Sequence, residues 1–283
     1  MTSTPAELTK VRYIEYDYWD ELSGGTRLAV DAAARIRAGV TPFGVPNGLV
    51  LAIAQEQVTG RLEVIAQIAA LLDGQNPGHP LRVAIDGVTS SGKTTLAGEL
   101  AEALTGRGRP VIRLSMDGYH HPREYRYRKG RTSPDGYYED AYDFDAFARL
   151  VLMPLGPGGD RRYHRRVIDL ASDTPVSNDI AIAAPDAVVL VDGSFLQRPE
   201  IIELWDCRIY ADTSLAVARQ RGVARDAAQL GGAAQADRLY EVRYHAAAAR
   251  YLAEVRPAER AHLRVKNDNL ASPTLVNQRS ARC

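Results

Sequence analysis

The sequence has few cysteines, no excess of charge and no long apolar run. Its two cysteines are too few for the disulfide framework of a small secreted domain, and they form no cluster of metal ligands. The 35 basic residues balance the 35 acidic ones, so net charge gives no general attraction to nucleic acid or to a membrane. No uncharged apolar stretch is long enough to span a bilayer. The N-terminal segment carries several carboxylates and no apolar core, so we expect no secretion signal and a cytoplasmic location.

The remaining composition is that of an ordinary globular protein. Of 283 residues, 45% are hydrophobic and 25% are charged, which suits one large domain or a domain with an extension. The pattern predicts helices over 26–38 and 49–72, and the segment 73–80 (DGQNPGHP) has the composition of a linker. We therefore expect residues 1–80 to form an N-terminal helical extension and linker, and residues 81–283 to form the main domain.

The stretch at 82–95 is the strongest functional signal. Residues 87–94 read GVTSSGKT and match the phosphate-loop pattern G-x-x-x-x-G-K-[ST] at every fixed position. An apolar run predicts a strand before the loop, and Leu96, Leu100 and Leu104 recur at helical spacing after it. A strand, a glycine-rich turn and a helix gather backbone N–H groups at the positive end of the helix dipole, where a polyphosphate binds. The sequence therefore predicts binding of ATP or GTP.

Individual positions of the loop have expected roles. Gly87 and Gly92 allow the backbone to turn and to approach the anion closely. Lys93 is expected to reach the β and γ phosphates, and the Thr94 hydroxyl to hold Mg²⁺. The nucleotide-binding residues that we predict are Gly87, Val88, Thr89, Ser90, Ser91, Gly92, Lys93, Thr94, Thr95 and, from a later helix, Arg219.

From residue 81 onward the apolar pattern alternates between strand and helix. This alternation predicts an α/β fold of the P-loop NTPase type, a doubly wound parallel sheet of about five strands with helices on both faces. The expected strands are 83–86, 111–115, 187–192, 208–211 and 263–265. A polar insertion at about 117–186 follows the second strand, where open α/β folds build their substrate sites.

Asp117 comes directly after the second expected strand, at the sheet edge that faces the γ-phosphate in such a fold. A carboxylate there can accept the proton of a substrate hydroxyl as that hydroxyl attacks. The alternative is an aspartate that caps a turn, helped by the following Gly118. The neighbouring phosphate loop favours the catalytic interpretation.

Asp192 ends the apolar strand at 187–192. A carboxylate at this place is typical of a group that holds Mg²⁺ or orients its water, although many strands end in aspartate because a turn follows. The interpretation therefore depends on the phosphate loop and on Asp117. We assign Thr94 and Asp192 to the metal.

Three arginines, Arg219, Arg221 and Arg225, lie on a helical stretch within a lid expected at about 216–235. The lid contains a small-residue break at 230–234 (LGGAA). A lid of this kind closes over the phosphates and neutralises charge during transfer, whereas the alternative is a solvated helix face. We assign Arg221 and Arg225 to catalysis together with Lys93.

These segments resemble the uridine kinase and phosphoribulokinase branch of P-loop kinases, which includes pantothenate and nicotinamide riboside kinases. GVTSSGKTT is similar to the family's nucleotide loop, and SMDGYH to the segment with its catalytic aspartate. EDAYDFDAF, VLVDGSFL and ARQRGVARD resemble the helix after the substrate insertion, the V-x-E-G-x-x-L stretch and the lid. PAERAHLRVKNDN resembles the last strand and the loop near the adenine. The resemblance, over residues 81 to about 270, implies ATP, Mg²⁺ and phosphoryl transfer to a hydroxyl.

The sequence departs from the family's pattern where uridine kinases hold the nucleoside. Their Phe-Asp pair is replaced by Gly136 and Tyr137, and the histidine expected after Tyr163 is replaced by Ile168. We expect a nucleoside-like acceptor, with an anionic acceptor such as a pantothenate-like compound or a sugar phosphate as the alternative. The substrate contacts that we predict are Tyr119, His120, Arg131, Tyr137 and Tyr163.

The insertion also contains a basic segment at 123–131 with interleaved tyrosines, REYRYRKGR. Its charges suit a substrate carboxylate or phosphate, or equally a solvated loop paired with nearby carboxylates. The adjacent His120 and His121 are better suited to a substrate hydroxyl than to a metal, because no third ligand is evident.

Other function classes fit the sequence less well. A GTPase needs a base-reading N-K-x-D, which the segment 266–269 (KNDN) does not supply. A non-catalytic nucleotide sensor would bind ATP without phosphorylating an acceptor. A balanced net charge disfavours a nucleic-acid kinase. We therefore expect a small-molecule hydroxyl substrate, no nucleic acid or membrane partner, and N-terminal helices compatible with a homodimer.

Overall fold

The computed structural model describes the backbone of residues 47–277 and the side chains of residues 60–276. Contacts divide the chain into Met1–Gly60 and Arg61–Cys283. The described part of the first unit is the beginning of helix α2 (Asn47–Asp73). The helix expected at 26–38 lies outside the described residues, whereas the one expected at 49–72 is confirmed by α2.

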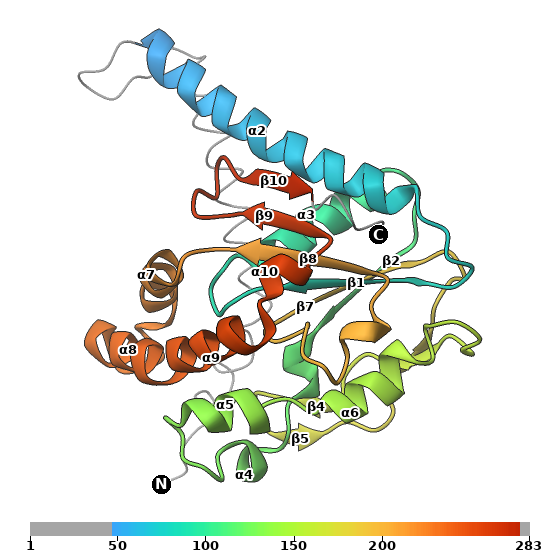
Figure 1. The fold of residues 1–283 in the computed structure, drawn as a ribbon, viewed down its shortest axis with the longest axis vertical. Coiled ribbons are helices and arrows are strands. Elements are labelled where there is room, and N and C mark those ends of the chain that lie inside the picture. Colours follow the sequence, from blue (N-terminus) through green and yellow to red (C-terminus); the bar gives the residue numbers. More distant parts are fainter. Residues whose placement is uncertain (1–46, 278–283) are drawn as a thin grey trace, which may run out of the picture. The chain divides into compact units, whose positions relative to one another are not determined.

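The second unit is built on a six-stranded sheet in the order β10-β9-β8-β1-β7-β2 (Figure 1). Every neighbouring pair is parallel except β9 and β10, which are antiparallel. Five of the strands confirm the sequence prediction, and the sixth, β10, was not expected. The strands are β1 (Leu81–Asp86), β2 (Val111–Ser115), β7 (Val188–Gly193), β8 (Cys207–Asp212), β9 (Leu263–Lys266) and β10 (Thr274–Asn277).

The central strands are apolar along their whole length because both faces of the sheet are covered. All residues of β1 and β7 are buried. Val188 and Leu190 pack with the side chains of helix α3 (Lys93–Thr105), whereas Val189 and Val191 pack in a second cluster with aromatic residues of the insertion. This alternation places one hydrophobic cluster on each face, as a doubly wound sheet requires.

The insertion after β2 is folded rather than open. The 3₁₀ turn η2 (Met116–Tyr119) begins it, and a π-helical turn η3 (Ala148–Leu152) follows its helices. The helices are α4 (Arg123–Arg126), α5 (Pro134–Asp140) and α6 (Phe144–Phe147). Two small antiparallel pairs join β3 (Arg162–His164) to β6 (Ile180–Ile182) and β4 (Ile168–Asp169) to β5 (Thr174–Pro175).

The helices after β8 form the expected lid region and its continuation. The predicted break is present, since Gly231 and Gly232 adopt φ values of 82° and 111°, which few residues other than glycine accept. The elements are α7 (Leu215–Asp226), α8 (Ala233–Leu239), the π-helical η5 (Tyr240–His245), α9 (Ala246–Val255) and α10 (Pro257–Arg260), with the 3₁₀ turn η4 (Ile202–Leu204) before β8.

The last turns of α2 belong to the second unit. Ile68 and Leu72 are fully buried with the core of β1 and α3, and Arg61 pairs with Glu99 at 2.6 Å. By contacts the chain divides after Gly60, inside the helix, whereas composition predicts a domain boundary at the linker 73–80. Within the described range, no helix combines the length and apolarity needed to cross a bilayer.

Candidate active site

The phosphate loop closes between β1 and α3 with the backbone geometry that its glycines allow. Gly92, at φ 86°, and Ser90, at φ 64°, are in the left-handed region, and α3 begins at the next residue, Lys93. A Cβ atom at Gly87 would lie 2.9 Å from the Ala211 carbonyl oxygen, so only glycine fits there. The predicted loop is therefore present, with its backbone at the beginning of a helix.

Two side chains from other strands fix the back of the loop. The Asn267 Nδ2 group donates to the Ser91 carbonyl at 2.7 Å, and the Thr213 hydroxyl donates to the same oxygen at 2.9 Å. The carboxyl ends of β8 and β9 thus hold the loop in place.

Thr94 and Arg113 form a polar cluster with the buried Asp192 beside the loop. The Thr94 hydroxyl donates to Asp192 Oδ2 at 2.7 Å, and Arg113 Nη2 donates to Asp192 Oδ1 at 3.1 Å. Burial raises the pKa of the Asp192 carboxyl, and the Arg113 charge and the Thr94 hydrogen bond oppose that shift. This pairing joins the two residues predicted to hold Mg²⁺.

The donor set of Thr94 and Asp192 fits Mg²⁺, which prefers hard oxygen ligands. Among the residues that the structure describes, no three His, Cys, Asp or Glu side chains gather into a metal site. A Mg²⁺ ion here would therefore take its remaining ligands from phosphate oxygens and water, as is usual for nucleotide-bound Mg²⁺.

Asp117 lies on η2 at the end of β2, where its side chain is 48% exposed. His120 Nε2 approaches Asp117 Oδ1 at 3.4 Å, while His120 Nδ1 lies 2.8 Å from the Ala141 carbonyl oxygen. Because a carbonyl only accepts, Nδ1 carries a proton, and Nε2 can donate to Asp117 when the ring is doubly protonated. The His120 ring also stacks on Tyr142 at 4.3 Å, which fixes its plane.

Lys93 and Asp117 influence each other's ionisation. Burial lowers the pKa of the Lys93 ammonium, while the charges of Asp192 and Asp117 oppose the shift. Burial raises the pKa of the Asp117 carboxyl, but the hydrogen bond and charge of His120, together with the charges of Lys93 and Arg225, outweigh this effect, so that the pKa lies below its ordinary value. Asp117 is therefore ionised at neutral pH, as a proton acceptor must be.

The three lid arginines contact three different places. Arg219 pairs with Asp237 at 2.5 Å and with Glu241, both outside the loop. Arg221 donates to the carbonyl oxygens of residues 267 and 268 at 3.0 and 2.6 Å. Arg225 bonds Asp226 at 2.6 Å and is the lid arginine whose charge acts on both Lys93 and Asp117.

Tyr240, at the start of η5, was missed by the sequence analysis although it touches the loop. Its hydroxyl lies 2.8 Å from Ser90 Oγ and donates to Asp226 Oδ2 at 2.7 Å. A Cβ at Gly222 of α7 would lie 2.0 Å from the Tyr240 ring, so the glycine makes room for it. The glycine inside a helical pattern was the signal that could have indicated this contact.

Asp86, the last residue of β1, was also missed. It is fully buried and accepts hydrogen bonds from the Tyr251 hydroxyl at 2.6 Å, Gln197 Nε2 at 3.0 Å and the Gly87 amide at 2.8 Å. Burial raises the pKa of this carboxyl, and these donors oppose the shift. The carboxyl group therefore ties the loop to α9 and to the segment after β7.

The predicted substrate residues divide into two groups. The Tyr137 hydroxyl lies 3.1 Å from Thr89 Oγ1 of the loop, and His120 faces Asp117, so both are at the site. Tyr119 and Tyr163 are buried in the same hydrophobic cluster as Tyr137, but no side-chain hydrogen bond or ring contact joins either of them to the loop or to Asp117 among the described residues. The Tyr119 hydroxyl donates to a main-chain carbonyl at 2.6 Å, which accounts for its inward direction.

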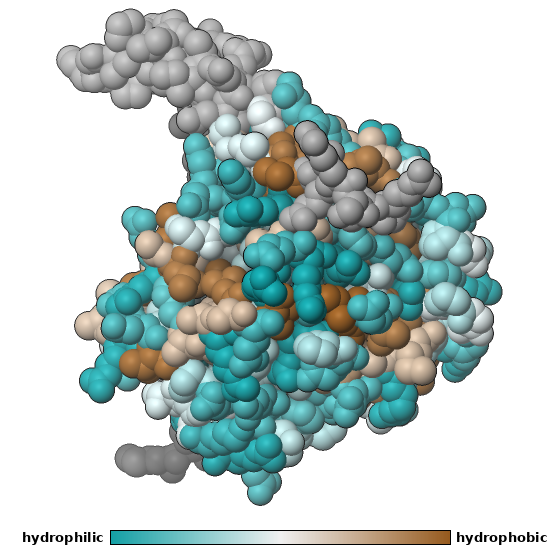
Figure 2. Space-filling view, in the orientation of Figure 1, coloured by the Kyte–Doolittle hydropathy of each residue, from teal (hydrophilic) through white to brown (hydrophobic). Residues whose placement is uncertain are grey.

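The basic segment of the insertion is largely neutralised by carboxylates. Hydrophilic residues cover most of the part of the surface where α4 and α5 lie (Figure 2). Arg126 pairs with Asp173 at 2.8 Å, Arg128 with Asp140 at 2.6 Å, and Lys129 with Glu139 and Asp140. Arg131, whose guanidinium lies over the Tyr127 ring at 5.1 Å, makes no ion pair among the described residues.

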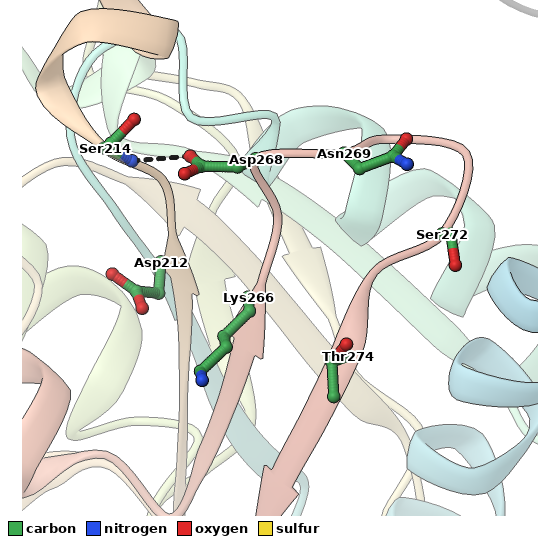
Figure 3. A pocket seen from close by; sticks show the side chains of 7 residues that line it. All are labelled: Asp212, Ser214, Lys266, Asp268, Asn269, Ser272 and Thr274. Atoms are coloured by element: carbon green, nitrogen blue, oxygen red, sulfur yellow. Dashed lines mark hydrogen bonds between the residues drawn. The ribbon is translucent and has the colours of Figure 1, made fainter.

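A polar pocket of about 360 Å³ lies at the ends of β8, β9 and β10 (Figure 3). Asp268 accepts a hydrogen bond from the Ser214 amide at 2.7 Å across it, and Asp212 and Lys266 extend from neighbouring strands. It is lined by Asp212, Ser214, Lys266, Asp268, Asn269, Ser272 and Thr274. The pocket adjoins Asn267, which bonds the back of the phosphate loop.

The known sequences that are similar to this chain are those of kinases. No protein-family model matches the chain. A uridine kinase from Leuconostoc citreum (strain KM20) is 26% identical over 153 residues, 54% of this chain and 71% of the relative. A uridine kinase from Clostridium novyi (strain NT) is 24% identical over the same number of residues and the same shares.

Solved structures have the same fold. A candidate uridine kinase from Bacillus stearothermophilus aligns with a TM-score of 0.56 and 22% identity, covering 72% of this chain and 96% of that one. A candidate fructose transport system kinase from Silicibacter sp. TM1040 aligns with a TM-score of 0.50 and 27% identity, covering 71% and 94%. The α/β fold expected from the sequence is thus confirmed.

Proposed function

We propose, because sequence and fold both resemble the uridine kinase-like and phosphoribulokinase-type P-loop kinases, that this protein transfers the γ-phosphate of ATP to a hydroxyl of a small molecule. The observation that carries the proposal is the convergence of three groups at one sheet edge. Lys93 and Thr94 begin the helix after β1, Asp192 lies near the carboxyl end of β7 and bonds Thr94, and the Asp117–His120 pair follows β2. This is the edge at which open α/β folds bind ligands.

In the proposed reaction Asp117 accepts the proton of the acceptor hydroxyl, and Lys93 contacts the phosphates. Thr94 and Asp192 hold Mg²⁺, which when bound offsets the negative charge of the phosphates. Arg225, and Arg221 after a shift of the lid, neutralise the transferring group. Most of the rate enhancement then comes from positioning and charge stabilisation.

The pocket of Figure 3 is the proposed place of the adenine. It adjoins the back of the phosphate loop through Asn267, and Arg221 of the lid donates to the main-chain carbonyl oxygens of Asn267 and Asp268 beside the pocket. The family resemblance of 257–269 also points to this region. The amide and carboxyl groups that line it can bond a purine edge.

The acceptor is proposed to be nucleoside-like, on the strength of the uridine kinase resemblance. The aromatic cluster of Tyr137, Tyr142 and Tyr244, which reaches the loop through the Tyr137 hydroxyl, supports this, because a nucleoside base packs well among aromatic rings. The alternative is an anionic acceptor, which Arg131 favours because the described residues supply no carboxylate for its charge.

The test is release of ADP from Mg·ATP in the presence of uridine, cytidine, nicotinamide riboside, pantothenate, ribulose 5-phosphate and simple sugars. Stimulation by any of these in wild type, and its loss in Lys93→Ala, would support the kinase. Bound ATP without phosphorylation of any acceptor would support a sensor instead. Unchanged kinetics in Lys93→Ala would contradict the role of the loop.

A further inference from the structure

The guanidinium of Arg243, on η5, is buried without a carboxylate partner among the described residues. Arg243 is 6% exposed and lies over the rings of Tyr127, Tyr137 and Tyr244, at 5.1, 5.2 and 5.7 Å from their centroids. Its Nη1 group donates to the Arg131 carbonyl, and its Nε group has no hydrogen-bond partner in the described part of the chain. Such a cation normally has a counter-charge.

The Arg131 guanidinium lies over the same Tyr127 ring at 5.1 Å. Four other basic side chains of the insertion and of α9 are already neutralised. Arg126, Arg128, Lys129 and Arg250 pair with Asp173, Asp140, Glu139, Asp135 and Glu254. Arg131 and Arg243 thus place two guanidinium groups over the same tyrosine ring, and the described residues supply a carboxylate for neither of them.

This arginine pair lies on the acceptor side of the site. The Tyr137 ring separates Arg243 from the phosphate loop, because its hydroxyl contacts Thr89 while its face meets the guanidinium. Tyr137 also packs against Tyr142, which stacks on the histidine that faces Asp117. The arginines are therefore about one tyrosine ring from the phosphate loop, on the side of the insertion.

We propose that Arg131 and Arg243 bind an oxyanion, a carboxylate or a phosphate, carried by the acceptor. The inference rests on the proposed kinase function and favours its alternative acceptor, an anionic hydroxyl compound, over a neutral nucleoside-like one. Planar guanidinium groups match the two oxygens of a carboxylate or phosphate, and such charge-assisted hydrogen bonds are stronger than neutral ones. The bound anion would supply the counter-charge that the buried Arg243 lacks.

The first experiment requires no knowledge of the acceptor. The full chain is saturated with a non-hydrolysable ATP analogue and Mg²⁺, and thermal unfolding is followed while inorganic phosphate or acetate is added at constant ionic strength. Wild type should gain several degrees at millimolar phosphate or acetate, and the anion with the larger shift indicates which group the acceptor carries. Arg131→Gln, at an exposed position, should lose most of the gain.

Arg149→Gln is the matched control, because Arg149 is also exposed and lies on η3, outside the proposed subsite. It should keep the wild-type gain. Equal gains in wild type and Arg131→Gln, or no gain in wild type with either anion, would overturn the proposal. Arg131→Gln is used before Arg243→Gln because the buried residue also contributes packing.

The second experiment compares acceptors that differ by one anionic group, pantothenate with pantothenol and ribulose 5-phosphate with ribulose. Phosphorylation of the anionic member should exceed that of the neutral one, and Arg131→Gln should lower kcat/KM for the anionic member about 10- to 100-fold while leaving the neutral one unchanged. Equal rates of phosphorylation of both members by wild type would contradict the anion-binding subsite without contradicting the proposed kinase function. If the protein did not bind nucleotide, the proposed kinase function would be contradicted instead. The anion titration, repeated without nucleotide, would then test whether Arg131 and Arg243 bind an oxyanion.

Discussion

Asp117 is the residue whose replacement separates chemistry from nucleotide binding. Its carboxyl group is ionised at neutral pH and lies outside the phosphate loop. Asp117→Asn should lower kcat about 10²- to 10⁴-fold, the usual contribution of a general base, with little change in ATP affinity. Steady-state ADP release and calorimetric titration of ATP measure the two effects. Glu124→Gln, at an exposed position on α4, is the matched control, and wild-type turnover in Asp117→Asn would rule out the assignment.

His120 should set the pH at which Asp117 loses activity. The hydrogen bond and charge of His120 lower the pKa of Asp117, whereas burial raises it. Removal of the imidazole in His120→Gln therefore raises the Asp117 pKa, and the acidic limb of kcat/KM should move to higher pH. His79→Gln provides the control, because that ring also approaches an aspartate, at 3.8 Å from Asp206, but outside the site. An acidic limb that stays in place would show that His120 does not act on Asp117.

For single residues, the sequence predicts the site residues that lie within one contiguous motif. It does not predict contacts between residues from distant segments. The loop residues and the neighbourhood of Asp117 followed from their pattern. Tyr119 was wrongly placed in the site because the 3₁₀ turn directs it into the core, two residues after the half-exposed Asp117. Arg243 gave no local signal, since its importance depends on rings more than a hundred positions earlier in the chain.

Among the elements, the lid helix α7 is linked to the phosphate loop through one tyrosine. Gly222→Ala would place a Cβ 2.0 Å from the Tyr240 ring, whose hydroxyl contacts Ser90. Glycine to alanine within a helix normally stabilises it by up to about 1 kcal/mol, but here overpacking should cost about 1–3 kcal/mol and raise the KM for ATP. Thermal unfolding and ATP kinetics measure both.

Gly106→Ala is the comparison for that substitution. Gly106 has a helical φ of −62°, and its new Cβ would find its nearest atom at 3.4 Å, so it should be neutral or stabilising. If both substitutions had the same effect on stability and on the KM for ATP, the close contact between Gly222 and Tyr240 would not determine how α7 packs.

The parallel strands were predictable because each is a continuous buried apolar run, and their alternation with helices leaves few topologies. Strand β10 was not, because its four residues, TLVN, follow a loop and have no clear period. Its pairing with β9 is antiparallel and lies at the sheet edge, where a short segment has little sequence signature.

For the whole molecule, the structure predicts where the chain can be shortened. A variant that begins at Arg61 keeps the buried Ile68 and Leu72 and should fold and bind ATP. A variant that begins at Leu81 loses both side chains, each of which contributes about 1.5–3 kcal/mol when buried, and should be far less stable. Denaturant unfolding and ATP titration test this. Equal stability of the two variants would place the boundary at the linker after all.

The hydrogen bonds of the buried Asp86 carboxyl group restrict which substitutions this chain can accept during evolution. Its side-chain hydrogen-bond donors, Gln197 and Tyr251, come from segments more than a hundred positions away, and no ion pair joins it to a basic side chain among the described residues. Loss of either donor leaves a buried negative charge undersatisfied, whereas an uncharged residue at 86 would free both partners. In related lineages these three positions should therefore be replaced together, and a covariation signal among them would record the contact.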